Sequence, residues 1–172
     1  DLFLSWGQAF PKAFEVYNTN EKFKSIGNHM INIEKSDVEK DSISFFTQEI
    51  DSIIQKENFE ELLELAKYLS IKYKQYRIII RLHPQTSKLT KSLINKNLQH
   101  CQNVKFMNPS RFSISDVLSR SKIAISINST VLFEAMMFDV IPLFFNNINM
   151  PNSELNPVEM KMAIEVNSIN QA

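Results

Sequence analysis

The residues of this chain with the clearest chemical potential are Asn128, Ser129 and Thr130, three polar side chains between two apolar segments. The apolar run Ile123–Ile127 is β-branched and too short for a helix, so it predicts a buried strand. The residues after Thr130 favour a helix, with Ser129 or Thr130 as its N-cap. Backbone N–H groups and the helix dipole meet at such an end, so an anion such as phosphate could be held there without a lysine.

Glu134 adds a carboxylate one helical turn further along, on the same face as Thr130. From that position it could reach a hydroxyl of a sugar or ribose. Asp139 stands where a helix often ends in a left-handed residue, and a second apolar run, Val140–Phe145, follows it. The stretch 123–145 therefore predicts strand, loop, helix and strand, which is a βαβ unit.

The rest of the chain continues this alternation. The clearest helix pattern is the helical spacing of apolar residues in Phe59–Tyr73. Further strands are predicted at Ser42–Thr47, Tyr76–Leu82 and Val104–Met107, and further helices at Thr86–Leu98, Ser113–Ser121 and, closing the chain, Val158–Val166. We therefore predict an α/β fold class: a Rossmann-like, doubly wound, mainly parallel sheet with helices on both faces.

The first 40 residues have a different pattern. They suggest short strands at Leu2–Ser5 and Lys24–Ile26, a helix at Phe10–Tyr17 and a polar linker at Asn32–Lys40. The chain does not begin with Met, and its first residues resemble a strand taken from something larger. We therefore expect a fragment in which residues 1–40 are a remnant of an inter-domain segment and linker, and residues 41–172 form one Rossmann-like domain.

Composition limits the classes of partner. The 19 basic and 19 acidic residues cancel, so no basic field indicates nucleic acid as a partner. Hydrophobic residues make up 44% of the 172, enough for a substantial core, but no apolar run approaches the ~18 residues of a membrane span. The single cysteine, Cys101, excludes an internal disulfide framework and suits a reducing compartment such as the cytoplasm.

Polar or turn-forming residues follow four of the predicted strands. They are Thr47-Gln48, His83-Pro84, Asn108-Pro109-Ser110 and Asn128-Ser129-Thr130. In open α/β sheets, ligands bind outside the carboxyl ends of the strands. If the sheet is parallel, these groups converge on one rim, and that rim is the predicted ligand site.

Several of these motifs resemble a known family. Arg81-Leu82-His83-Pro84, the segment Ser126–Ala135 and Ile141-Pro142 resemble the C-terminal, donor-binding half of GT-B glycosyltransferases, above all bacterial capsule and surface-polysaccharide enzymes with a His-Pro motif. Ser5-Trp6-Gly7 and Ser25-Ile26-Gly27-Asn28 resemble the segment that joins the two halves of such proteins. Similar patterns occur in glycerophosphotransferases that use CDP-glycerol and in UDP-GlcNAc 2-epimerases.

The resemblance implies roles for individual residues. His83, followed by Pro84, would contact the donor phosphate, Ser129 and Thr130 would hold a phosphate at the helix mouth, and Glu134 would bind ribose hydroxyls. Thr47 and Gln48 would line the pocket where many relatives carry a glycine-containing loop. This chain departs from the pattern there, because its only glycines are Gly7 and Gly27, and it also has Phe138-Asp139 where relatives often have Gly-Lys.

The resemblance also implies a function: nucleotide-sugar binding by residues 41–172 of a glycosyltransferase that makes bacterial surface polysaccharide. The expected partners are a nucleotide-sugar donor, a glycan acceptor and a missing N-terminal domain that supplies the base, with no cofactor and no metal. The expected location is the cytoplasm, with peripheral association of the full-length protein at the inner face of the membrane. Two alternatives stay open: a CDP-glycerol-type glycerophosphotransferase or UDP-GlcNAc 2-epimerase-like domain, and a non-catalytic association domain.

Structural explanations compete with these roles. His83-Pro84 could simply end a strand, and Ser129 and Thr130 could only cap a helix. For Arg81 the sequence favours a surface charge over a second phosphate contact, whereas Met136, Met137, Phe144 and Phe145 are predicted to lie in the core.

Overall fold

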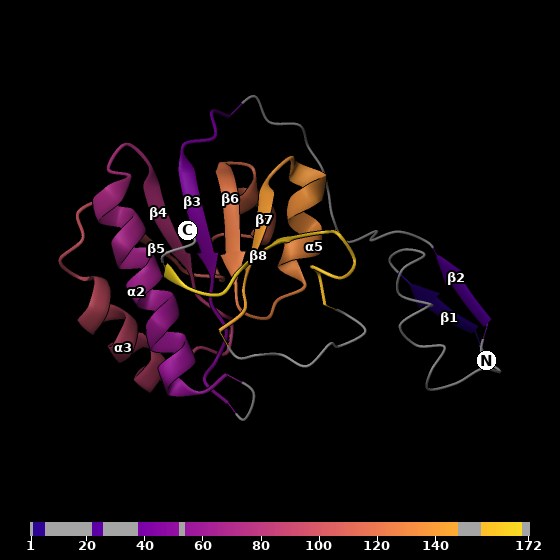
Figure 1. The fold of residues 1–172 in the computed structure, drawn as a ribbon, viewed down its shortest axis with the longest axis horizontal. Coiled ribbons are helices and arrows are strands. Elements are labelled where there is room, and N and C mark those ends of the chain that lie inside the picture. Colours follow the sequence, from indigo (N-terminus) through magenta and orange to yellow (C-terminus); the bar gives the residue numbers. More distant parts are fainter. Residues whose placement is uncertain (1, 6–21, 26–37, 52–53, 148–155, 170–172) are drawn as a thin grey trace.

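The computed structural model describes residues 2–5, 22–25, 38–51, 54–147 and 156–169. The main element is a six-stranded parallel sheet with the strand order β5-β4-β3-β6-β7-β8 (Figure 1). Its strands are β3 (Ser42–Phe46), β4 (Arg77–Arg81), β5 (Val104–Met107), β6 (Ser121–Ser126), β7 (Ile141–Phe145) and β8 (Ile164–Val166). A separate two-stranded parallel sheet pairs β1 (Leu2–Ser5) with β2 (Lys22–Ser25).

Helices connect the strands of the main sheet. They are α2 (Lys56–Lys72), α3 (Lys88–Leu98), α4 (Ile114–Leu118) and α5 (Val131–Ala135), which continues into the 3₁₀ turn η1 (Met136–Phe138). The chain runs outward from β3 to β4 and β5, returns to the other side of β3, and runs outward again through β6, β7 and β8. This is the Rossmann strand order 3-2-1-4-5-6. The predicted α/β, doubly wound fold is therefore confirmed.

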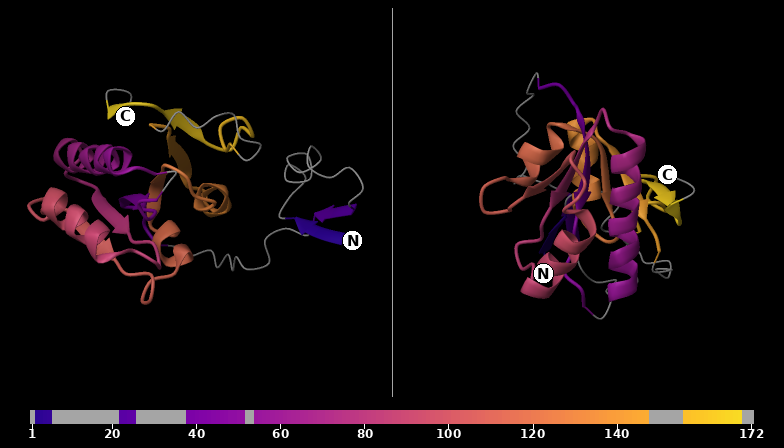
Figure 2. Two further views of the ribbon diagram at one scale, coloured as in Figure 1. Left: turned by 90° about the horizontal axis from the view of Figure 1, so that it is seen from below. Right: turned by 90° about the vertical axis from the view of Figure 1, so that its left-hand side faces the viewer.

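The two faces of the sheet carry separate hydrophobic cores, because alternate side chains of a strand point to opposite faces. On β4, Ile78 and Ile80 pack with α2 and α3, whereas Ile79 packs with α4 and α5. Figure 2 shows α2 and α5 on opposite sides of the sheet. A strand covered on both faces must be apolar at consecutive positions, which explains the isoleucine run 78–80.

Buried serines join the two central strands to α4. The Ser44 hydroxyl on β3 lies 2.6 Å from that of Ser121 on β6, and the Ser121 hydroxyl donates to the carbonyl of Val117 at 2.7 Å. Near the other end of β6, the Ser126 hydroxyl donates to the carbonyl of Phe46 on β3 at 2.8 Å. Each of these hydroxyls has a hydrogen-bond partner although its residue is fully buried. Burying small polar side chains at the centre of the sheet therefore costs little free energy.

The helical segment after β6 ends as the sequence predicts. Asp139 has φ 53° and ψ 44°, the left-handed conformation. Its N–H donates to the carbonyl of Met136 at 3.3 Å, and the N–H of Val140 donates to the carbonyl of Ala135 at 3.1 Å. This pair of hydrogen bonds is the Schellman motif, which turns the chain directly into β7.

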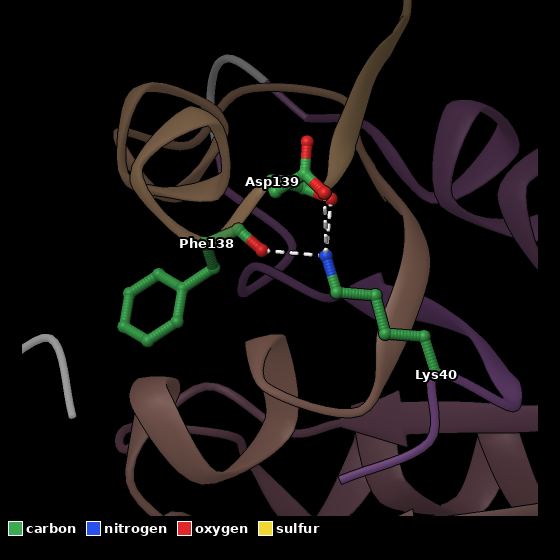
Figure 3. A network of polar contacts seen from close by, with 3 residues as sticks. All are labelled: Lys40, Phe138 and Asp139. Carbon is green, nitrogen blue, oxygen red and sulfur yellow. Dashed lines mark hydrogen bonds and ion pairs between the residues drawn. The ribbon is translucent and has the colours of Figure 1, made fainter. Parts of the chain in front are cut away.

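Lys40 completes this helix end from a distant part of the chain. Its ammonium group donates to the carbonyl oxygens of Phe138 (2.7 Å) and Asp139, and pairs with the Asp139 carboxylate at 3.5 Å (Figure 3). Carbonyls at a helix end lack partners within the helix, and a cation there is favoured by the helix dipole. Because Lys40 stands just before β3, it ties that strand to the end of η1.

The predicted closing helix at Val158–Val166 is wrong. The backbone forms turns there, with the N–H of Met162 donating to the carbonyl of Pro157 at 2.8 Å, and residues 164–166 are strand β8, paired in parallel with β7. Lys161 has φ 56°, which a helix does not allow. Pairing with the sheet edge has overridden the local helical tendency.

Other expectations have mixed outcomes. Phe144 and Phe145 are buried as predicted, but Met136 and Met137 are 47% and 42% exposed, because η1 lies at the end of a short helix. Cys101 is a free cysteine. The predicted helix Phe10–Tyr17 and most of the linker Asn32–Lys40 lie outside the described residues, and the domain division at residue 40 stays a prediction.

The contact of Lys40 can be tested by denaturation. Lys40→Met should lower the free energy of unfolding by about 1–2 kcal/mol, because two carbonyls lose a charged donor. As a control, Asp139→Asn keeps a residue that tolerates the left-handed conformation and removes only an exposed ion pair, so its urea midpoint should stay close to that of the parent. Equal losses in both variants would show that the ion pair, not the carbonyl contact, matters.

Candidate functional site

A cleft of about 440 Å³ lies at the carboxyl ends of β3, β4 and β6. Phe46, Thr47 and Gln48 line it from β3 and its loop, Arg81, His83 and Pro84 from β4, and residues 128–131 from the loop after β6. Ile114 of α4 adds an apolar contact. The cleft therefore opens at the point where the strand order reverses, which is where Rossmann-like sheets bind ligands.

Six of the seven predicted site residues gather in this cleft: Thr47, Gln48, His83, Pro84, Ser129 and Thr130. The seventh, Glu134, is not among its lining residues. Asn108-Pro109-Ser110 are also absent from the lining, because they follow β5 at the edge of the sheet, away from the strand reversal.

On the β3 side, Thr47 joins the two neighbouring strands. Its backbone N–H and its hydroxyl both donate to the carbonyl of Arg81, each at 3.1 Å, and the residue is only 4% exposed. The hydroxyl hydrogen is thus used within the protein, so Thr47 shapes the cleft wall. Gln48 beside it is partly exposed.

On the β4 side, the His-Pro pair makes a tight turn that fixes the imidazole. The carbonyl of His83 accepts from the N–H (3.0 Å) and the hydroxyl (2.6 Å) of Thr86, with Pro84 at the second turn position, which its ring favours. The Nδ1 atom of His83 accepts from the backbone N–H of Gln85 at 3.2 Å. A neutral ring then carries its proton on Nε2, which is a hydrogen-bond donor for a ligand oxygen.

On the β6 side, two hydroxyls stand at the start of α5. The Ser129 Oγ accepts from the N–H of Val131 at 3.3 Å, a local capping contact. Thr130 has helical backbone angles, is exposed, and makes no capping hydrogen bond with its side chain. Ser129 therefore has a structural role in addition to lining the cleft, while the Thr130 hydroxyl is not committed to the cap.

Glu49 fastens the loop after β3 to the start of α3. Its carboxylate accepts from the backbone N–H of Ser87 at 2.9 Å and from the hydroxyl of Thr90 at 2.6 Å. Burial alone would raise the pKa of Glu49, but the hydrogen bonds from Thr90 and Ser87 outweigh it, so the pKa lies below its usual value of 4.5. This contact holds the loops that carry Gln48 and His83 relative to each other.

Arg81 is a cleft residue for which the sequence favoured a surface charge. Its side chain is partly buried, Nη2 donates to the carbonyl of Phe112 at 3.4 Å, and Nε is buried without a hydrogen-bond partner among the described residues. Burial lowers the pKa of Arg81, and the carboxylates of Glu134 and Asp116 oppose this shift. The sequence feature that could have indicated this position is the spacing of Arg81 and His83. They are two residues apart, and residues at that spacing share one face of an extended strand.

Glu134 lies on α5 and is partly buried. Burial raises the pKa of Glu134, and the positive charge of Arg81 partly offsets that effect. No ion pair joins the two side chains directly within the described part of the chain, so they interact at longer range.

Two further kinds of feature are absent from the described residues. No group of three or more His, Cys, Asp or Glu side chains in those residues could hold a metal ion. Among the helices of the same residues, none is long and apolar enough to cross a bilayer.

No protein-family model and no curated protein sequence matches this chain. Solved structures do. UDP-N-acetylglucosamine 2-epimerase from Rickettsia bellii matches with a TM-score of 0.60 and 18% identity over 98% of this chain and 47% of its own. TarM of S. aureus, in a complex that includes UDP, matches with a TM-score of 0.55 and 15% identity over 98% and 34%. KpsC of Thermosulfurimonas dismutans, a beta Kdo 2,4 transferase, matches with 0.51 and 12% over 95% and 49%.

These similarities establish the fold of this chain. It has the Rossmann-like fold of the C-terminal half of GT-B glycosyltransferases and epimerases, as its sequence motifs predicted. The chain spans half or less of the length of each of these structures.

The contact of Glu49 predicts an acid-dependent loss of stability. A carboxylate with a lowered pKa stabilises the folded state above its unfolded pKa, near 4.5, and loses that contribution as pH falls through the folded value. Glu49→Gln should therefore cost about 1 kcal/mol of unfolding free energy at pH 7, and the difference from the parent should shrink below pH 4.5. Urea denaturation at pH 7 and in acid measures both values.

Thr90→Val supplies the control for this experiment. It removes one donor to Glu49 at a fully buried position with little change of volume. In that background Glu49→Gln should have a smaller effect at pH 7. An undiminished effect would mean that Glu49 acts without this hydrogen bond.

Proposed function

We propose that this chain is the donor-binding half of a glycosyltransferase that acts in bacterial surface-polysaccharide synthesis, and that its cleft binds the nucleotide-sugar donor. The observation that carries this proposal is the convergence of six predicted site residues from three strand ends on one cleft at the strand reversal. Solved proteins with this fold include TarM in a complex with UDP and KpsC, a Kdo transferase.

The cleft supplies the groups that transfer from a nucleotide sugar needs. When the sugar leaves for an acceptor hydroxyl, negative charge develops on the departing phosphate, and donors already aimed at that position accelerate the step. His83, which can donate through Nε2, and the hydroxyl of Thr130 are the donors that we assign to this phosphate. The base for the acceptor is assigned by resemblance to an N-terminal half, so this chain should bind the donor without transferring the sugar alone.

A UDP-GlcNAc 2-epimerase-like domain is the second candidate. It is favoured by the match to the Rickettsia bellii epimerase, which extends over 98% of this chain. Both candidates need the same nucleotide pocket and differ in the fate of the sugar. Conversion of UDP-GlcNAc into its C2 epimer by the full-length protein, followed by NMR without any acceptor, would favour the epimerase over the transferase.

The cleft is evidence against the hypothesis of a non-catalytic association domain. That hypothesis expects the strand-end residues to be buried against one another without a cavity. Instead, His83 is only partly buried, Thr130 is exposed, and both line a space of about 440 Å³. Pockets of roughly 300–1,000 Å³ are typical of small-molecule sites, so ligand binding explains this arrangement better than association.

A thermal-shift titration with UDP, CMP, CDP and GDP tests the proposed function. A ligand that binds only the folded state at 100 times its Kd should add about 2.7 kcal/mol to stability. We expect one nucleotide class to raise the melting temperature, and His83→Ala and Thr130→Val to weaken that shift. The magnitude at fixed ligand concentration reports the loss of affinity in each variant.

His100→Ala is the matched control. His100 is exposed on the loop after α3 and is not among the cleft residues, so its removal should leave the nucleotide shift unchanged. If none of the four nucleotides shifts the parent, the proposal of a nucleotide site on this chain is overturned. An equal shift in the parent and both cleft variants would place nucleotide binding elsewhere on the chain.

A further inference from the structure

Arg81 has hydrogen-bonding capacity that the described part of the protein does not use. A guanidinium group has five N–H donors in a fixed plane. Only Nη2 has a described partner, the carbonyl of Phe112 at the long distance of 3.4 Å, and Nε is buried with none. A partly buried cation with unfilled donors is suited to a ligand that brings negatively charged oxygen atoms.

The charges in and near the cleft also favour a negatively charged ligand. Among the described residues that line it, Arg81 and His83 are the ionisable groups, and none is an aspartate or glutamate. Asp116 on α4 interacts electrostatically with Arg81. Its carboxylate already accepts hydrogen bonds from the backbone N–H (2.7 Å) and the hydroxyl (2.8 Å) of Ser113. Glu134 acts on Arg81 from α5 without a direct ion pair in the described residues. The cleft itself therefore presents positive charge, with the balancing carboxylates outside its lining.

We propose that Arg81 binds the phosphate charge of the nucleotide donor, and that Glu134, which is partly buried on α5 and is not among the residues that line the cleft, is the partner charge that supports this guanidinium rather than a ligand for ribose hydroxyls. This inference rests on the proposed function, since it assigns the phosphate subsite of that cleft. It also explains how the cleft binds phosphate although its loops lack glycine: the planar fork of Arg81 replaces close contact of the backbone.

The role of Arg81 predicts a loss of affinity that depends on phosphate. By isothermal titration calorimetry at fixed salt, Arg81→Gln should weaken the binding of UDP by about 10- to 100-fold. Inorganic pyrophosphate, which carries the charge without the nucleoside, should lose affinity by a similar factor. Arg81→Lys keeps the charge but not the fork, so its affinity should lie between those of the parent and Arg81→Gln.

Arg77→Gln is the matched control for charge. Arg77 lies at the opposite end of the same strand, is exposed, and pairs with Asp41 at 2.9 Å, so its removal lowers the net charge equally but leaves the cleft intact. Its affinity for UDP should stay within about twofold of the parent, because an exposed charge far from the site is screened by salt.

The role of Glu134 has its own readout. If Glu134 bound ribose hydroxyls, Glu134→Gln would weaken UDP and leave 2′-deoxy-UDP almost unaffected. As a partner charge of Arg81, it should change the affinities for both nucleotides by the same factor. The ratio of the two Kd values therefore decides between these roles, even if the overall affinity changes in either case.

Each outcome has a definite meaning. If UDP binds the parent and Arg81→Gln equally well, the role of Arg81 is overturned while the nucleotide site stands. A changed ratio of UDP to 2′-deoxy-UDP affinity in Glu134→Gln overturns the role of Glu134. If none of UDP, CMP, CDP and GDP binds the parent, the nucleotide proposal is overturned, and this inference is overturned with it. If Arg81→Gln does not fold, Arg81→Lys provides the comparison, and unchanged affinities for UDP and pyrophosphate in that variant would overturn the role of Arg81.

Discussion

The structure depends on the parallel pairing of β3 with both β4 and β6 at the centre of one sheet. After β3 the chain continues to α2 on one face, whereas after β6 it continues to α5 on the other. The loop after β3 and the loop after β6 therefore run to opposite faces of the sheet. This leaves a space between them at the carboxyl ends of the two strands. The cleft is a consequence of this pairing, and its chemistry is set by the residues that happen to end the three strands.

Much of this arrangement could be predicted from local pattern. The isoleucine run of β4 is apolar at consecutive positions, and polar or turn-forming residues follow four of the predicted strands, so a parallel sheet with one polar rim was predictable. The motifs around His83-Pro84 and Asn128-Ser129-Thr130 indicated the GT-B fold, which the solved structures share. Even the left-handed Asp139 followed from its place between a helix and a strand.

The features that the sequence did not predict depend on contacts between distant parts of the chain. Arg81 has the pattern of an exposed strand-end charge, yet its side chain is partly buried, and the carboxylates whose charges act on it belong to α4 and α5. The residues after Pro157 have a helical composition, yet the free edge of β7 recruits residues 164–166 as a strand. In both cases the deciding neighbour lies far away in sequence, so no local window of the sequence contains the information.

The position of Lys40 has a mechanical consequence. One ammonium group joins the chain just before β3 to the end of η1, at the edge of the sheet opposite the cleft. Tension or torque applied to the preceding chain therefore acts both on the central strand and on the end of the helical segment that begins at Val131. Lys40 therefore connects, at the end of the sheet away from the cleft, two elements whose other ends carry Thr47 and Thr130, so a force applied at residue 40 acts on the supports of both cleft walls and not on one alone.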